Sequence, residues 1–445
     1  MFRRFVISGI LIWCALGASA RTRLHYGGTL RLEVQGDPWQ GPDGIARRLT
    51  MDGLTQLDTA GTVQPALSSR WESQNDDHRW QFWIRSNVQF HDGTPLTADA
   101  VALSLTQSCR YRCPWTKVHA VGQSVVFTSD LPTPDLPSQL AQAKFLISHQ
   151  NAQGTLEGTG AFRPAGFPHG VMVFTANDDH WSGRPFVDTV EVRPRRSIRD
   201  QWMDMGIGRT DVVEVPPEML RQAGQQHLTI VASRPGNLLL LQIENTGPLA
   251  NPQIRQAIAL AVDRNALSNV IFQKQGEITA GLLPSALSGY GFLFSCDRNL
   301  NRAQELRSGA TPPQLTLAVE DGNAAMQLSA ERIVLNLREA GFKVQLAPVG
   351  GKTEGDIVLR QIHLETNDPR AALDEIAEDS EQHVSINGTD IASIYRAEKD
   401  VLATYTVVPL LYLPRAYAIS ERVRDLRLAV DGSPLIADAA IEDTK

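Results

Sequence analysis

Two short segments carry residue types that could perform acid–base chemistry. His91 and Asp92 are adjacent, and residues 178–180 read Asp-Asp-His. A histidine titrates near neutral pH, and a neighbouring carboxylate could orient it as a general base. Polar residues beside Asp-Gly are equally typical of turns, in which they hydrogen-bond the backbone. The chain contains no Gly-x-Ser-x-Gly, no His-Glu-x-x-His and no dinucleotide fingerprint in context. We favour the turn interpretation, and we predict no catalytic residue and a protein that is not an enzyme.

Three of the four cysteines, Cys109, Cys113 and Cys296, lie beyond the apolar N-terminal segment. In an oxidising compartment an odd number indicates one disulfide and one free thiol, or no bridge at all. Cys109 and Cys113 are one helical turn apart just before Pro114, so a bridge between them requires the end of the helix to deform. No Cys-x-x-Cys or His-x-x-x-His spacing occurs, and we predict neither a metal site nor a cofactor.

The elements around His91 follow from local patterns. Residues 80–85 alternate between large apolar and other side chains, which predicts a strand with one buried face, and Asp92-Gly93 supplies the turn after it. Thr97 then has the character of a helix N-cap, with Asp99 in the first turn, where the helix dipole favours an acid. The segment therefore reads as strand, turn and helix.

The chain carries 49 acidic and 42 basic residues, a formal charge of −7. Residues 1–20 combine two arginines, an apolar run and Ala18-Ser19-Ala20, the pattern of a secretory signal peptide cleaved near Ala20. The apolar run is too short for a comfortable membrane span, and lipidation at Cys14 is disfavoured because Trp13 stands where a small residue is needed. Removal of the two arginines changes the charge to −7 − 2 = −9, which argues against a nucleic-acid partner.

The second half of the chain shows regular α/β patterning. Residues 238–243 form a continuous apolar run, typical of a strand covered on both faces. Asn251-Pro252 predicts the start of an amphipathic helix, and Asp263-Arg264 begins another. Residues 315–346 read as strand, long helix and strand, a βαβ unit that predicts a parallel sheet with its ligand site at the carboxyl ends of the strands.

Several motifs, in the right order along the chain, resemble the family 5 extracellular solute-binding proteins, the dipeptide and oligopeptide receptors of ABC importers. The most recognisable lie within residues 57–71 and 89–101. Others are Gly158-Thr159-Gly160, the segment from Asn177 to Trp181, and the Asn-Pro-x-Ile-Arg-Gln-Ala-Ile motif that begins at Asn251. The resemblance extends from about Gly27 to the C-terminal region.

This resemblance implies an α/β fold of the periplasmic-binding-protein type II-like kind, with two lobes and an additional small α+β domain. After the signal peptide, residues 1–20, the implied first lobe is discontinuous and comprises residues 21–50, 159–250 and 410–445. Residues 51–158 form the additional domain and residues 251–409 the second lobe. The family also places the helix predicted for Ile45 to Leu54 beside the ligand cleft.

The resemblance also implies a ligand anchor. In peptide-binding members an acid four positions before a proline in the second lobe pairs with the peptide's amino terminus, and Glu365 stands four residues before Pro369. The residue could equally be an exposed loop acid. Trp39, Tyr290 and Phe292 are aromatic residues that could stack on a ligand, or belong to the core.

We therefore predict a periplasmic, monomeric solute-binding protein. We expect it to capture a small ligand in an interlobe cleft and to deliver it to ABC permease subunits in the inner membrane. The ligand that we favour is a peptide. Within the binding class, the alternatives are a nickel chelate, haem, an opine or an oligosaccharide. The other classes are a sensor or interaction protein that keeps the receptor fold, and an exported enzyme that uses His91 or residues 178–180.

Overall fold

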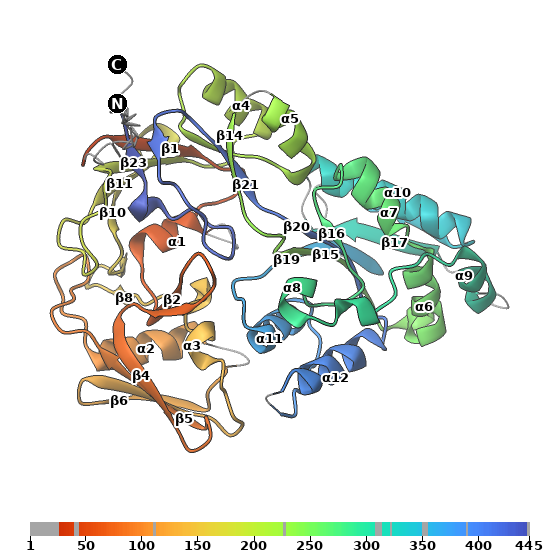
Figure 1. The fold of residues 1–445 in the computed structure, drawn as a ribbon, viewed down its shortest axis with the longest axis horizontal. Coiled ribbons are helices and arrows are strands. Elements are labelled where there is room, and N and C mark those ends of the chain that lie inside the picture. Colours follow the sequence, from red (N-terminus) through yellow and green to blue (C-terminus); the bar gives the residue numbers. More distant parts are fainter. Residues whose placement is uncertain are drawn as a thin grey trace, which may run out of the picture.

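The computed structural model describes residues 26–39, 44–109, 113–225, 228–307, 314–320, 323–348, 355–388 and 390–442. These residues form two lobes and an additional domain, each with its own core (Figure 1). In that view the first lobe is at the upper left, the additional domain below it and the second lobe at the right. The predicted signal peptide lies outside the described residues. Within those ranges, no helix has both the length and the apolar character needed to cross a bilayer.

The first lobe is built on a seven-stranded sheet whose centre is parallel. β1 (Thr29–Glu33) pairs in parallel with β12 (Thr189–Arg193) on one side and with β13 (Val212–Glu214) on the other. The remaining strands are antiparallel to their neighbours: β10 (Phe162–Gly166), β11 (Met172–Ala176), β21 (Ala416–Ile419) and β14 (Thr229–Ala232). Leu30 and Leu32 of β1 are almost completely buried, so this strand lies at the centre of the lobe's core.

The second lobe contains the βαβ unit that the sequence predicts. β17 (Gln314–Val319) pairs in parallel with β18 (Lys343–Leu346), and α10 (Ala324–Glu339) connects them. β17 is also parallel to β19 (Ile357–His363). The sheet as a whole is mixed, because β15 (Asn237–Ile243) is antiparallel to β19 and to β20 (Val407–Leu413), and β16 (Glu277–Ile278) is antiparallel to β20.

β15 explains why the boundaries between the lobes differ from those predicted. Leu239 and Leu241 face one hydrophobic cluster of the second lobe, while Leu238 and Leu240 face another, so the strand is covered on both faces as its apolar run predicts. Its sheet belongs to the second lobe, which therefore begins near Asn237 and includes β20 to its end, rather than spanning residues 251–409. An apolar run indicates burial but does not indicate in which sheet the strand pairs.

The additional domain packs a four-stranded antiparallel sheet against a helix. Its strand order is β4-β5-β7-β6, and α2 (Ala98–Ser108) crosses β6 and β7. Thr97 caps α2 as predicted, accepting the N–H of Ala100 on Oγ1 at 3.1 Å. The strands of this domain are β2 (Thr55–Leu57), β3 (Val63–Pro65), β4 (Ser68–Gln74), β5 (Arg79–Ile84), β6 (Lys117–Val121), β7 (Ser124–Thr128), β8 (His149–Gln150) and β9 (Leu156–Glu157).

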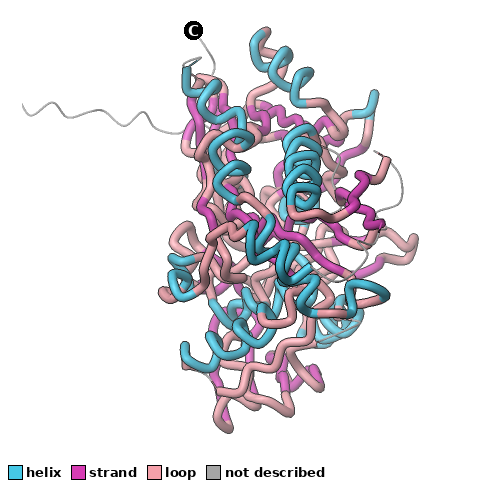
Figure 2. The backbone as a smooth tube through the Cα atoms, turned by 90° about the vertical axis from the view of Figure 1, so that its right-hand side faces the viewer, coloured by secondary structure: helices cyan, strands magenta, loops and turns pink. Residues whose placement is uncertain are grey.

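Helices cover the sheets, and Figure 2, which looks at the side of the second lobe, shows them lying over the strands. Asn251 caps α6 (Pro252–Ala261), as predicted, through a 3.0 Å hydrogen bond from the N–H of Gln253. α1 ends at Thr50 rather than near Gly53, because Met51 has an extended backbone. The other helices are α1 (Ile45–Thr50), α3 (Leu136–Gln139), α4 (Ile198–Gly206), α5 (Leu220–Gln225), α7 (Arg264–Ala266), α8 (Ser285–Ser288), α9 (Leu300–Arg307), α11 (Pro369–Asp379) and α12 (Ile391–Leu402).

Candidate functional site

Glu365 lies where all three parts of the molecule meet. It follows the carboxyl end of β19 by two residues, and its side chain is only 14% exposed, so it is not an exposed loop acid. Its Oε2 accepts the backbone N–H of Ala143 from the additional domain and lies 3.3 Å from Nη2 of Arg48 on α1 of the first lobe. One carboxylate of the second lobe therefore contacts both of the other parts.

Arg48 connects Glu365 to a second buried acid. Its Nη2 also contacts Oδ2 of Asp431, whose carboxylate accepts the N–H of Ser433 at 2.8 Å and its hydroxyl at 2.9 Å. Burial opposes ionisation of Asp431, but the interactions with Arg48, His363, the backbone N–H of Ser433 and Arg415 outweigh it and lower the pKa of this carboxyl. Asp431 therefore stays ionised at neutral pH.

A third acid, Glu375 of α11, stands behind Glu365. Its two carboxyl oxygens each lie 3.2 Å from the backbone N of Glu365. Burial and the negative charge of Glu365 raise the pKa of Glu375 well above its usual range. The buried position and the neighbouring acid therefore both disfavour ionisation of Glu375.

Two cavities are lined by the short segment that carries Glu365. A cavity of about 310 Å³ is lined by residues of all three parts: Arg48, Leu49, Asp52, Phe162, Glu365 and Asp431. The neighbouring residues Leu364 and Thr366 line a second cavity of about 570 Å³, which also lies between the lobes. Both volumes are in the range of small-molecule binding sites.

A third cavity, of about 420 Å³, also lies between the two lobes. The first lobe contributes Gln35, Pro216 and Tyr417 to its lining, and the second lobe contributes Asn237, Met326 and His363. His363 and Asn237 are both buried and their side chains are in contact. His363 lines this cavity and Glu365 lines the one of about 310 Å³, although the two residues are only two positions apart at the end of β19.

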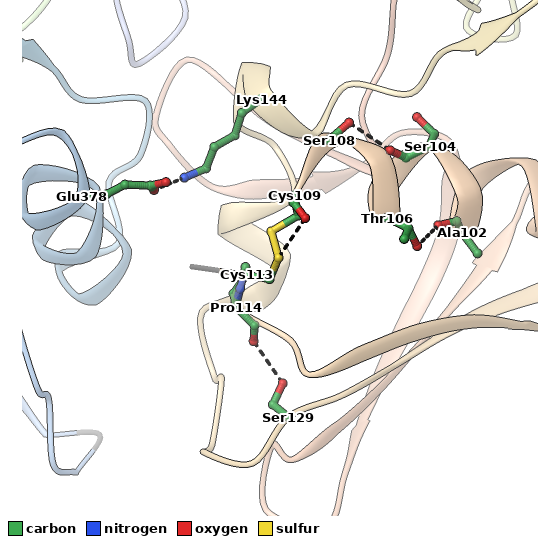
Figure 3. Close-up of a disulfide and its surroundings, with 10 residues drawn as sticks. All are labelled: Ala102, Ser104, Thr106, Ser108, Cys109, Cys113, Pro114, Ser129, Lys144 and Glu378. Carbon is green, nitrogen blue, oxygen red and sulfur yellow. Dashed lines mark hydrogen bonds and ion pairs between the residues drawn. A yellow bond between two sulfur atoms is a disulfide. The ribbon is translucent and has the colours of Figure 1, made fainter. Parts of the chain in front are cut away.

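Further polar contacts join the additional domain to α11 and the end of β19. Lys144 Nζ lies 2.7 Å from Glu378 Oε2, and Gln142 donates from Nε2 to Glu375 Oε2 at 3.3 Å (Figure 3 shows the first of these). The hydroxyls of Ser138 and Thr366 are 2.7 Å apart. Separation of the second lobe from the additional domain would break all of these contacts.

None of the three predicted aromatic residues is among the residues that line these cavities. Trp39 is 37% exposed and lies beside Phe174 on the first-lobe sheet. Tyr290 belongs to the second-lobe core, where its hydroxyl donates to Oε2 of buried Glu398 at 2.7 Å. Phe292, at 82%, is the most exposed large apolar side chain among the described residues. The structure therefore does not bring these aromatic side chains together with Glu365.

The structure joins Cys109 and Cys113 in a disulfide, with their Cα atoms 5.6 Å apart (Figure 3). Cys296 remains a half-buried thiol. α2 ends at Ser108, so both cysteines lie beyond its last turn. Cys113 faces the gap between the additional domain and α11, where it lines a cavity with Lys144 and Glu378.

The residues considered for acid–base chemistry serve the backbone or form ion pairs. Nε2 of His91 hydrogen-bonds the carbonyl of Gly160 at 2.9 Å, and burial lowers the pKa of this histidine. Asp178 is exposed and pairs with Arg184, whereas His180 is buried and lies 3.4 Å from Asp52. Asp178 and His180 therefore have different partners, and the Asp-Asp-His segment does not form one group of interacting side chains. Among the described residues, no group of three or more His, Cys, Asp or Glu is placed to hold a metal ion.

Sequence reasoning missed Arg48, Asp431 and Glu375 as parts of this site. The only signal for Arg48 was that the predicted helix containing it was expected beside the cleft. Asp431 and Glu375 carry no local motif, and their proximity to Glu365 depends on the packing of distant segments. They are recognised only once the lobes are assembled.

Comparison with known proteins places this geometry in context. The model of "Bacterial extracellular solute-binding proteins, family 5 Middle" matches residues 62–383. The probable D,D-dipeptide-binding periplasmic protein DdpA of Escherichia coli is 24% identical over 333 residues, which are 66% of this chain and 63% of that protein. The probable di/tripeptide-binding protein 5 of Pseudomonas aeruginosa is 23% identical over 350 residues, 66% of each. The matched part spans less than two thirds of the length of either relative.

Solved structures match over almost the whole chain. NikA from Staphylococcus aureus, in complex with Ni(L-His)2, has a TM-score of 0.81 at 17% identity and covers 93% of this chain and 100% of its own. DppA from Helicobacter pylori, in complex with the peptide STSA, has a TM-score of 0.80 at 17% identity, with 94% and 99% covered. These similarities show the two-lobed type II fold.

Proposed function

The chain belongs to the bacterial extracellular solute-binding proteins of family 5, and on this premise we propose that it captures a short peptide between its lobes and delivers it to the permease of an ABC importer. It would act in the periplasm as a monomer, after cleavage of the signal peptide near Ala20. Binding and delivery require no catalytic group.

The observation that carries the proposal is the position of Glu365. Its carboxylate lies at the junction of the three parts and lines a cavity of about 310 Å³. A carboxylate in a cleft that excludes water forms a strong, charge-assisted contact with an ammonium group. The amino terminus of a peptide supplies such a group, and Glu365 is the acid to which the family pattern assigns this role.

Lobe closure follows from the same arrangement. A ligand between the lobes contacts residues of both, so it binds the closed form more tightly and shifts the equilibrium towards it. In this structure Lys144, Gln142 and Ser138 of the additional domain contact the second lobe, and opening between these two parts would break those contacts. The closed form then presents a single surface to a membrane partner.

The names of the relatives favour a peptide over the other ligands. DdpA and the di/tripeptide-binding protein 5 are named for peptides, whereas NikA is seen with a nickel chelate and AgaA from A.tumefacien R10 with agropinic acid. An acid at the junction suits any ligand with an ammonium group, which a peptide has at its amino terminus.

Native mass spectrometry of protein purified from an exporting host tests the proposal. We expect short peptides to co-purify, to be released on denaturation, and to be missing from Glu365→Gln. A protein without bound ligand, whose melting temperature is unchanged by peptides, would contradict it. A shift with a nickel chelate or an opine would reassign the ligand, and no shift with any of them would favour a sensor with the receptor fold.

A further inference from the structure

Arg48 already contacts the carboxylate of Glu365, the acid to which the ligand is proposed to bind. Its Nη2 contacts Asp431 and lies 3.3 Å from Glu365, so a single nitrogen serves two carboxylates. Its Nε is buried and has no hydrogen-bond partner among the described residues. Glu365 therefore does not receive the two-point contact that a guanidinium makes with a carboxylate at full strength.

The two acids belong to different moving parts. Arg48 is on α1, which packs in the first-lobe core, and the segment around Asp431 is fixed to the same core through Leu428 and Ile436. Glu365 follows β19 of the second lobe. When the lobes separate, Arg48 therefore keeps Asp431 and loses Glu365. Asp431 holds the guanidinium in place whether or not Glu365 is engaged.

We infer that Arg48 competes with the ligand's ammonium group for Glu365 and so sets both the affinity and the amine preference of the receptor; this inference rests on the proposed function. An ammonium is a compact charge with three donors and reaches Glu365 by displacing one guanidinium contact. The apparent affinity for the ligand equals the intrinsic affinity multiplied by the fraction of receptors in which Glu365 is free of Arg48. A ligand without an ammonium leaves the Arg48–Glu365 contact intact and escapes this competition.

The competition predicts opposite effects for two variants that share one substitution. Asp431→Asn releases Arg48 from its first-lobe partner, so the guanidinium engages Glu365 more fully and capture of amine ligands weakens. Arg48→Met combined with Asp431→Asn removes the competitor without leaving the buried Asp431 carboxylate unpaired. Capture of amine ligands should then strengthen, although both proteins carry the same change at position 431.

The test uses a pool of short peptides from a proteolytic digest, and the same pool after N-acetylation, with capture measured by native mass spectrometry. We expect the double variant to retain free-amine peptides at roughly three- to tenfold lower concentration than the wild type, and Asp431→Asn to require a higher one. The ratio of free to acetylated peptide captured should also rise in the double variant. If the double variant does not fold, Arg48→Lys replaces it in the test. The point charge of lysine spans both acids less well, so Arg48→Lys should also bind free-amine peptides more tightly than the wild type.

If the double variant folds and binds free-amine peptides no more tightly than Asp431→Asn does, the inference is overturned. Capture of peptides by the wild type would still leave the proposed function standing. If the wild type and all variants capture no peptide from either pool, the proposed function fails and the inference fails with it. The wild-type result therefore separates the two.

Discussion

Lys144 Nζ lies 2.7 Å from Glu378 Oε2, and this ion pair joins the additional domain to α11 of the second lobe. Both side chains are partly exposed, at 42% and 35%, so water weakens their attraction. With the hydrogen bond from Gln142 to Glu375, it forms one edge of the junction around Glu365.

Lys144→Gln should destabilise the protein only slightly, by less than about 1 kcal/mol, because exposed pairs contribute little. Urea unfolding of Lys144→Gln, Glu378→Gln and the double variant measures the coupling between the two side chains. A coupling above about 2 kcal/mol would show that the pair is desolvated rather than exposed.

The acids of α11 should make stability depend on pH. Burial and the charge of Asp135 raise the pKa of Asp374 to about 7, against the opposing charges of Arg370 and Lys144, with Asp368 also raising it. The folded protein therefore keeps this proton from about pH 4 to about pH 7, whereas the unfolded chain, with a value near 3.8, releases it. Its contribution to stability is fully present below about pH 4 and is lost as pH rises through about 7.

Asp374→Asn should remove this part of the pH dependence. Half-buried His91, whose pKa is lowered, gives stability the opposite dependence on pH, so the variant must be compared with the wild type at each pH. We expect the variant to gain stability over the wild type between pH 5 and pH 8, measured by urea midpoints. An unchanged difference across that range would contradict the assignment.

Gly160→Ala should disturb the end of α1, the helix that carries Arg48. A Cβ at position 160 would lie 2.4 to 2.6 Å from backbone atoms of Leu49, Thr50 and Met51, at the end of α1, and backbone there has little room to move. We expect a loss of about 2 to 3 kcal/mol in unfolding free energy. Gly206→Ala, where a Cβ meets nothing within 4 Å, is the matched control and should be neutral. Equal stability of the two variants would refute the close approach.

Tyr290→Phe should affect stability rather than ligand capture. The change removes the hydroxyl that donates to buried Glu398, and a buried carboxylate that loses a donor costs about 1 to 3 kcal/mol. Phe292→Ala, at an exposed position, should leave the melting temperature unchanged. If either variant captures ligand more weakly while its stability is unchanged, the substituted aromatic residue belongs to the binding site after all.

The sequence predicted elements whose signals are local. Thr97 and Asn251 cap their helices as predicted, and the strand–helix–strand unit of residues 315–346 forms as expected. In each case the residues that determine the element lie within a few positions of one another, or follow a single periodic pattern. The prediction of α1 ended too late, since periodicity does not fix the last turn.

The candidate site was predictable only in part, because its pairs are distant in sequence. Glu365 was found through a family pattern, but its partner Arg48 is 317 residues away and nothing in their spacing connects them. Tyr290 illustrates the same limit, since the acid that holds its hydroxyl is 108 residues along the chain. An aromatic residue suits a core or a cleft equally well until the packing is known.

The most direct test of the central claim is peptide capture by the wild type, Glu365→Gln and Glu378→Gln, measured by native mass spectrometry with one pool of short free-amine peptides. Both variants remove one acid from the junction, but only Glu365 lines the cavity shared by the lobes. We expect Glu365→Gln to lose capture at least tenfold, because an uncharged amide replaces the partner of the ammonium group, and Glu378→Gln to capture peptides as the wild type does. Equal capture by Glu365→Gln and the wild type would contradict the assignment of Glu365 as the ligand anchor.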